Sequence, residues 1–502
     1  MSPDSSPASS AAAGRRGPDP RLPVRATKIL RVRAVWMIPL AMASVVVAVM
    51  TILYIGSVVN QLAHLRGLPV AVVNQDRGAT IGAQHLQTGQ QVQAGLLASP
   101  AVSGRLHLEV MSLPQAEQAM DRDGLYATLV IPPGFTASLL NVAGVPTATP
   151  AAVTAPHVQI LTNEGAGSVG TQLATGILQP ALAVASHQIG QHLAALVPPG
   201  GRTAATQVLL ADPVTVTTAT YRPLPAGTAL GLSAFYVALL TLMCGFLGGT
   251  IVNSVVDSAL GYSTSEVGTR WRQRQPVPIN RWQTLLIKWA IVVTLTAVLT
   301  AAMLLIAAGL GMDAPSPVLL WAFTWLCAAS VGVGTITLFA VAGGYGQLIA
   351  MLVFVYAGLA SAGGTVPIEA LPAFLHTLSY VEPLRQVLAG TRSIMYFGSQ
   401  GVAGLTRGTV AASAGLLFWL VAGTAIVKWY DYRRLYRLNP DVLAHVNTAV
   451  EDYRARQAAP APVPPRAPAP AQGPAPAEPQ APASDAGQPP NGETGPSGPQ
   501  AG

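Results

Sequence analysis

The stretch that most limits how this chain can fold is residues 314–368, where 55 consecutive positions contain no Asp, Glu, Lys or Arg. One helix needs only about 20 apolar residues to cross a hydrocarbon core of about 30 Å. The stretch is therefore too long for one membrane span and long enough for two. The sequence GGYGQ at 343–347 is typical of a turn, so we place the break between the two spans there.

Four further apolar runs are long enough to cross a membrane. The first, at 36–56, contains 21 uncharged residues. A cleaved signal peptide is the alternative for it, but the run is long for one and lacks a clear small-residue cleavage site. With 51% hydrophobic and 10% charged residues, the composition is typical of a polytopic membrane protein. We predict an α-helical membrane protein with six spans: residues 36–56, 229–252, 285–311, 318–341, 347–362 and 408–427.

The segment between the first and second spans has the composition of a water-soluble domain. Strand patterns occur in LPVAVVN, RLHLEVM, YATLVI, HVQILTNEG and VTVTTATY, and helical patterns at 80–97, 116–120 and 168–196 alternate with them. This alternation predicts an α/β domain outside the membrane. The predicted organisation is a disordered basic N-terminus (1–34), a first transmembrane helix (35–56), the α/β domain (57–226), a five-helix transmembrane domain (227–428), a basic segment (429–457) and a disordered Pro/Ala-rich tail (458–502).

Basic residues gather at the ends of the apolar runs. They occur in residues 15–33, in the loop 257–284 and in KWYDYRRLYR at 428–437. Because cytoplasmic loops carry such clusters, we expect both termini and this loop on the inner side of the cell membrane. Orientation in the lipid bilayer then accounts for the excess of 28 basic over 21 acidic residues, and nucleic-acid binding is not favoured.

Residues 361–392 lie between two predicted spans but cannot form one, because they contain four charged side chains that would be costly at bilayer depth. Apolar residues recur there at helical spacing, and Pro372 and Pro383 stand where a first helical turn tolerates proline. The pattern predicts two short amphipathic helices broken at Pro383. We expect the segment 363–406 to dip into the membrane or lie along its outer face.

This segment supplies the candidate outer gate. Its residues are Leu371, Leu375, Leu378, Glu382 and Arg385. We expect the three leucines to pack against the fifth and sixth spans. Glu382 and Arg385 are three apart, and we expect an exposed pair worth under about 1 kcal/mol.

Motifs for catalysis are missing from the sequence. It contains no GxxxxGK[ST] phosphate loop, no GxSxG elbow and no HExxH zinc helix, so we expect no enzyme activity, no cofactor and no metal site. Cys244 and Cys327 both lie in apolar runs, which disfavours a disulfide.

Ionisable side chains are nearly absent from the middle of the spans, which disfavours ion-driven transport. We expect Asp257, Glu266 and Asp313 to be solvated at the membrane interfaces. Lys288 is expected to extend its side chain to the inner interface.

The loop after the second span is a candidate docking surface for a cytoplasmic ATPase. Its basic residues are Arg270, Arg272, Arg274 and Arg281, and a capping group at Ser263–Glu266 is expected to open an amphipathic turn. The alternative is that the loop only fixes membrane topology.

Three stretches carry a family resemblance. LPVAVVNQDRG, YATLVIPPGFTASLL and GGTVPIEALPAFLHTLSYVEPL make residues 30–435 resemble the type-2 ABC exporter permeases, and within them the phage-infection-protein-like (Pip/YhgE) group. The resemblance implies a dimer of membrane subunits and separate ATPases docked on the loop after the second span. It also implies short re-entrant helices that close the outer gate before the last span.

Two functions stay open from the sequence. The first is the membrane subunit of an exporter that moves an amphiphile such as a drug, lipid or envelope component. The second is an envelope receptor or scaffold that does not transport and acts through its external domain. A neighbouring gene for an ATP-binding subunit would favour the first.

Overall fold

The computed structural model describes residues 31, 33–81, 84–145, 155–196, 204–267, 270–272, 274, 276–277, 279–435 and 440–458. Nearly all of the predicted basic N-terminus and of the Pro/Ala-rich tail lies outside these residues. The chain divides into two units, Met1–Asn447 and Thr448–Gly502. The second unit contains the end of α18 (Pro440–Ala458), and the first contains every other element.

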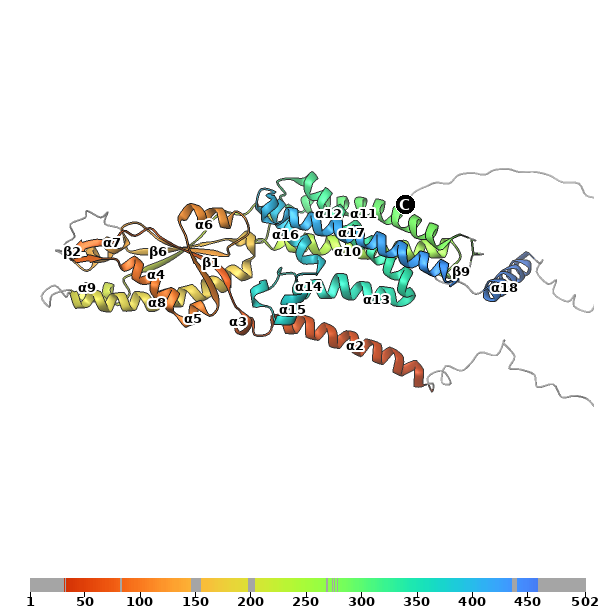
Figure 1. Cartoon of the computed structure of the whole chain (residues 1–502), viewed down its shortest axis with the longest axis horizontal. Coiled ribbons are helices and arrows are strands. Elements are labelled where there is room, and N and C mark those ends of the chain that lie inside the picture. Colours follow the sequence, from red (N-terminus) through yellow and green to blue (C-terminus); the bar gives the residue numbers. More distant parts are fainter. Residues whose placement is uncertain are drawn as a thin grey trace, which may run out of the picture. The chain divides into compact units, whose positions relative to one another are not determined.

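A five-stranded mixed sheet forms the centre of the α/β module (Figure 1). Its strand order is β4-β1-β5-β6-β7. β1 (Leu68–Asn74) is parallel to both β4 (Leu106–Val110) and β5 (Ala127–Ile131). β6 (His157–Thr162) is antiparallel to β5 and parallel to β7 (Thr215–Thr220). All five strands lie where the sequence patterns predict strands.

Helices cover both faces of this sheet. Val70 and Val72 of β1 belong to the core that contains Leu178 of α8 (Ser168–Leu196), whereas Ala71 and Val73 belong to a second core with Ala116 of α6 (Leu113–Met120). Figure 1 shows α6 and α8 on opposite sides of the sheet. Because β1 is buried on both faces, it reads as a continuous apolar run rather than as an alternating pattern.

The helix predicted to start at residue 80 begins eight residues later. Residues 79–86 instead form an antiparallel hairpin of β2 (Ala79–Ile81) and β3 (Gln84–Leu86). The carboxylate of Asp76 fixes the start of α4, because it accepts a hydrogen bond from the backbone N–H of Gly89 (3.2 Å) and another from that of Thr136 in α7 (3.2 Å). The helices of the module are α3 (Gln61–His64), α4 (Thr88–Ala98), α5 (Pro100–Ser103), α6 (Leu113–Met120), α7 (Phe135–Val142), α8 (Ser168–Leu196) and α9 (Ala204–Ala211), with a 3-10 turn η1 (Glu164–Ala166).

Long apolar helices form a bundle next to the module. The bundle contains α10 (Leu232–Ala259), α11 (Arg281–Gly309), α12 (Pro317–Ala342) and α17 (Leu405–Tyr432), whereas α2 (Arg33–Val58) packs on α14 (Ala357–Ser361). α12 packs against α10, α11 and α17. Gly245 and Gly249 permit the contact of α10 with α12, since a Cβ at either would press against Ala328, Val331 or Thr335.

Within the described residues, five helical segments are long and apolar enough to cross a membrane. The fourth, Pro317–Ser361, is 45 residues long and is broken at Gly343–Tyr345, where the sequence predicts a turn. Gly343 has a positive φ of 59°, and α13 (Gly346–Met351), a π-helical turn η4 (Leu352–Tyr356) and α14 (Ala357–Ser361) follow. This second part is shorter than the about 20 residues a span needs. Five candidate spans are thus present, and the sixth span and the sidedness stay predictions.

Candidate functional site

Short helical elements fill the segment between α14 and α17, as the sequence predicts. They are η5 (Ile368–Ala370), α15 (Ala373–Leu378), α16 (Pro383–Tyr396) and η6 (Gly401–Ala403). Pro372 immediately precedes α15, and Pro383 is the first residue of α16. Much of α16 is buried, including Val387, Leu388 and every residue from Gly390 to Met395. The segment is therefore packed into the protein and is not a loop exposed on its surface.

Glu382 caps the N-terminus of α16 from a buried position. Its Oε1 accepts a hydrogen bond from the backbone N–H of Leu384 (2.6 Å), and its Oε2 accepts one from that of Arg385 (2.9 Å). The residue is only 3% exposed. Burial raises the pKa of this carboxyl to about 7, although the two N–H groups and the Arg385 charge oppose the shift.

Gly358 of α14 leaves room for this carboxylate, because a Cβ there would collide with Oε1 of Glu382 and press on Leu384. The expectation of an exposed Glu382–Arg385 pair is wrong. The Glu382 carboxylate instead caps the N-terminus of α16, where free backbone N–H groups and the positive end of the helix dipole attract it.

Arg385 turns toward α15 instead. Its guanidinium donates a hydrogen bond to Ser379 Oγ (2.8 Å) and lies over the ring of Tyr380, 5.0 Å from the centroid. Among the ion pairs of the described residues, none joins Arg385 to Glu382. Arg385 therefore ties the start of α16 to the end of α15.

The three candidate gate leucines lie in one core cluster. Leu375 is completely buried, Leu371 is 5% exposed, and Leu378 is partly buried. The cluster includes Ala360 of α14 and Leu53 of α2. Helix α15 packs on α14, which in turn packs on α2. Within the described chain no residue of α17 belongs to this cluster, so the leucines pack toward the first and fifth predicted spans, without the sixth.

Polar contacts join the α/β module to the same segment. The Tyr126 hydroxyl donates to Glu369 Oε2 (3.4 Å), and the backbone N–H of Arg66 donates to the Glu369 carbonyl (3.0 Å). Burial is the main cause that raises the pKa of both the Glu369 carboxyl and the Tyr126 hydroxyl. Arg392 is 8% exposed, and its guanidinium donates to the Gly363 carbonyl (3.3 Å). The two hydrogen bonds of Glu369 thus connect the module to the 3-10 turn that precedes α15.

A buried ion pair lies at the other end of the bundle. Lys288 Nζ of α11 is 2.7 Å from Asp257 Oδ1 of α10 and donates to Asn253 Oδ1 at 2.7 Å. Lys288 is 5% exposed and Asp257 is 9% exposed. The expectations that Asp257 is solvated and that Lys288 extends to the interface are wrong, because the two side chains satisfy each other between adjacent helices. They line a cavity of about 600 Å³ together with Arg281 and Tyr430.

The loop after α10 forms a hairpin instead of a capped helical turn. β8 (Ser265–Val267) pairs antiparallel with β9 (Arg270–Arg272), so Ser263–Glu266 caps no helix. Arg274 is exposed, and the side chains of Arg270 and Arg272 lie outside the described part of the structure. Arg281 lies apart from the other three arginines of the predicted docking loop, because it is the first residue of α11. Its guanidinium lies over the ring of Tyr430 in α17, 5.6 Å from the centroid.

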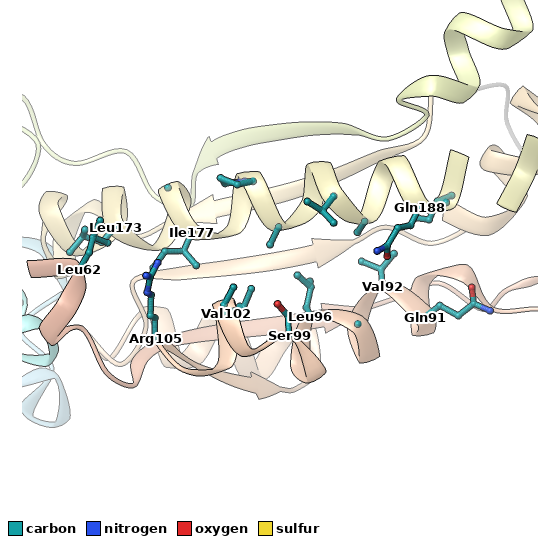
Figure 2. Close-up of a pocket in the computed structure, with 18 of the residues that line it drawn as sticks. Leu62, Gln91, Val92, Leu96, Ser99, Val102, Arg105, Leu173, Ile177 and Gln188 are labelled. Atoms are coloured by element: carbon teal, nitrogen blue, oxygen red, sulfur yellow. The ribbon is translucent and has the colours of Figure 1, made fainter. Parts of the chain in front are cut away.

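A second cavity lies in the α/β module, between α8 and the α4–α5 segment. It has a volume of about 750 Å³ and mostly apolar walls. Figure 2 shows Leu62, Leu173 and Arg105 at one end and Gln91 and Gln188 at the other. Across the described residues, no group of three or more His, Cys, Asp or Glu side chains is arranged to hold a metal ion.

A family model described as protein of unknown function (DUF3533) matches residues 38–419. The chain belongs to this family. The match begins inside α2 and ends inside α17, so the DUF3533 region contains the module, the ion pair and the α15–α16 segment.

One solved structure resembles part of this DUF3533 protein. It is the crystal structure of a domain of a "putative ABC type-2 transporter" from Thermotoga maritima MSB8, with 19% sequence identity and a TM-score of 0.21. The similarity covers 30% of this chain and 85% of that chain. None of the curated proteins matches the chain.

The ion pair and the module cavity are the features of this DUF3533 chain that the sequence reasoning missed. The sequence places Asp257 at the end of one span and Lys288 in the first turns of the next, but their pairing depends on the packing of α10 on α11. The cavity had no signal in the sequence, because its walls come from separate helices whose apolar faces resemble ordinary core.

Proposed function

We propose that this chain is the membrane subunit of an ABC-type exporter that moves an amphiphile outward across the plasma membrane and uses a separate ATPase subunit. The observation that carries the proposal is the α15–α16 segment, two short helices packed between the long apolar helices and the α/β module. A segment that only connected two spans would not need a buried cap such as Glu382 or a completely buried Leu375. The resemblance of its sequence to the re-entrant segment of type-2 ABC exporter permeases points the same way.

In this proposal the α15–α16 segment is the outer gate. Leu371, Leu375 and Leu378 close the path by apolar packing against α14, and Arg385 keeps α15 and α16 together through Ser379. The contacts of Tyr126 with Glu369 make the position of the gate depend on the module. As in the family that the sequence resembles, two copies of the chain form the pathway, and both termini are cytoplasmic.

Energy comes from an ATPase docked on the hairpin β8–β9. The hairpin joins α10 to α11, the two helices that carry Asp257 and Lys288, so a force on the loop acts on the buried ion pair. The exposed Arg274 and the neighbouring basic residues of β9 suit an acidic docking groove.

Charge reversal in the hairpin tests this docking. The variant Arg272→Glu/Arg274→Glu is expected to lose an ATP-binding subunit that copurifies with the wild-type chain, at an unchanged amount of membrane-inserted protein. The control is Arg433→Glu/Arg434→Glu, which makes the same charge change at two exposed positions after α17 and should keep the partner. A partner that stays bound to the hairpin variant would remove the docking site.

The alternative from the sequence, a receptor or scaffold that does not transport, predicts a different outcome. Such a protein would have no ATPase partner, and its loss would leave the export of amphiphiles unchanged. Measuring export of a fluorescent amphiphile from cells with and without the chain separates the two functions.

A further inference from the structure

The cavity between α8 and the α4–α5 segment begins close to the membrane-spanning part of the chain. Leu62, which lines it, lies in α3 only four residues after α2 ends at Val58. Figure 2 places Leu62 at the same end of the cavity as Arg105 and Leu173. This end of the groove therefore lies next to the outer end of the first predicted span.

The walls of the groove are apolar along four turns of α8. Val92, Leu96 and Val102 form a buried floor, and Ile177 lies opposite them (Figure 2). Leu62 and Val184 are 50% and 60% exposed, so apolar surface remains to be covered. From Leu173 to Gln188, α8 rises about 22 Å. One leaflet contributes about half of a 30 Å hydrocarbon core, so the groove is long enough for an acyl chain.

Two glycines keep the groove open. Gly95 of α4 and Gly176 of α8 both line it, and a Cβ added at either would meet nothing within 4 Å. Larger side chains at these positions would occupy the space between the helices. The two glycines therefore contribute to the open volume of the groove.

Arg105 is the one Lys, Arg, Asp or Glu side chain among the lining residues. It is exposed and lies at the membrane end, whereas Gln91 and Gln188 lie at the far end. A guanidinium at the mouth of an apolar groove favours a ligand with an anionic head and a hydrocarbon tail.

We propose that this groove binds a membrane-derived anionic lipid, whose acyl chain lies between α4 and α8 and whose head group is held by Arg105. The proposal rests on the proposed export function, in which the groove receives the amphiphile after it has passed the gate. A second copy of the chain is the other candidate occupant. The concave floor and the single cation at the membrane end favour the lipid.

Photolabelling of the full-length protein in lipid nanodiscs tests the proposal without any ATPase. The probe is palmitic acid with a photoreactive group on its chain, and labelled peptides are identified by mass spectrometry. We expect labelling in α4 and α8. In Gly95→Leu and Gly176→Leu, labelling should fall at least about tenfold, because the chain no longer fits. In the control variant Gly309→Leu the new side chain also enters open space, but in α11. The probe should label α4 and α8 of this variant as it labels those of the wild type.

Arg105→Gln separates the head-group contact from the groove. It should weaken labelling by the fatty acid but not by the uncharged photoreactive hexadecanol. A thermal unfolding scan of each variant shows whether it is folded. If a leucine variant does not fold, Arg105→Gln still tests the proposal. Equal labelling of the wild type and the filled variants would overturn the proposal, and so would disulfide-linked dimers of Val184→Cys that exclude the probe. Loss of ATP-driven export with labelling intact would contradict the proposed function but leave the lipid site.

Discussion

Replacing Glu382 by glutamine removes a buried carboxyl while keeping an oxygen that can accept from the N-terminus of α16. In the folded protein the pKa of this carboxyl is raised from 4.5 to about 7, mainly by burial. Between these two values the folded state binds more protons than the unfolded state. The free energy of unfolding of the wild type therefore falls as pH rises from about 4.5 to 7, and it loses no more from this group at higher pH.

The size of the effect follows from the difference between the two pKa values. That difference, 7 minus 4.5, is 2.5, and at 1.36 kcal/mol for each pKa unit it corresponds to about 3 kcal/mol. About 2 kcal/mol of this is lost between pH 5 and pH 8. The glutamine side chain of the variant cannot ionise, so the variant lacks this contribution. Its absolute stability does not enter the comparison, since only the pH dependence is compared.

The assay is reversible unfolding of the purified protein in mixed micelles at pH 5 and pH 8, followed by tryptophan fluorescence. The wild type should lose about 2 kcal/mol more than Glu382→Gln between the two pH values. Glu451→Gln, at an exposed position of α18, is the control and should behave like the wild type. An identical pH dependence of the wild type and Glu382→Gln would refute the claim that burial in the folded protein disfavours the ionised form of Glu382.

Gly358→Ala should lower the unfolding free energy by about 1–3 kcal/mol because its Cβ meets the Glu382 carboxylate, whereas Gly309→Ala, with open space around it, should not destabilise the protein. Lys288→Met should cost about 3–5 kcal/mol by leaving Asp257 buried without its cation, and the added Asp257→Asn should recover part of the loss in the same assay. Leu375→Ser/Leu378→Ser should change export at equal membrane insertion, while Phe374→Ser, at an exposed position of the same helix, should not; unchanged export in the first variant would remove the gate. In intact cells, single cysteines at Gln90, Ser316 and Ser399 should react with an impermeant thiol reagent, and labelling at Ser265 or Ala458 would contradict the topology.

Local patterns predicted the elements of the fold well where burial and turn chemistry agree. The apolar run of β1, the break at Gly343 and the starts of α15 and α16 at Pro372 and Pro383 are each specified by a few adjacent residues. The prediction for residues 80–97 failed at its start because the polar hairpin β2–β3 and the contact of Asp76 with α4 depend on tertiary structure.

The short helical elements between α14 and α17 were predicted in place, but the partners of their charged side chains were not. Glu382 and Arg385 were expected to face each other because of their spacing, whereas the free N–H groups of α16 attract the carboxylate and Ser379 receives the guanidinium. Lys288 and Asp257 are 31 positions apart, 288 minus 257, so only the packing of α10 on α11 brings them together. Such side-chain pairs depend on which helices pack against each other, and a single sequence does not specify this packing.

The most direct test of the exporter proposal is transport by the purified chain reconstituted in vesicles together with an ATP-binding subunit that copurifies with it. The measurement is ATP-dependent movement of a fluorescent amphiphile into inside-out vesicles, compared with vesicles that contain either subunit alone. The proposal predicts accumulation only when both subunits and ATP are present, and less of it in the Arg272→Glu/Arg274→Glu variant. Equal accumulation without ATP, or none from a complex that hydrolyses ATP, would contradict the exporter function.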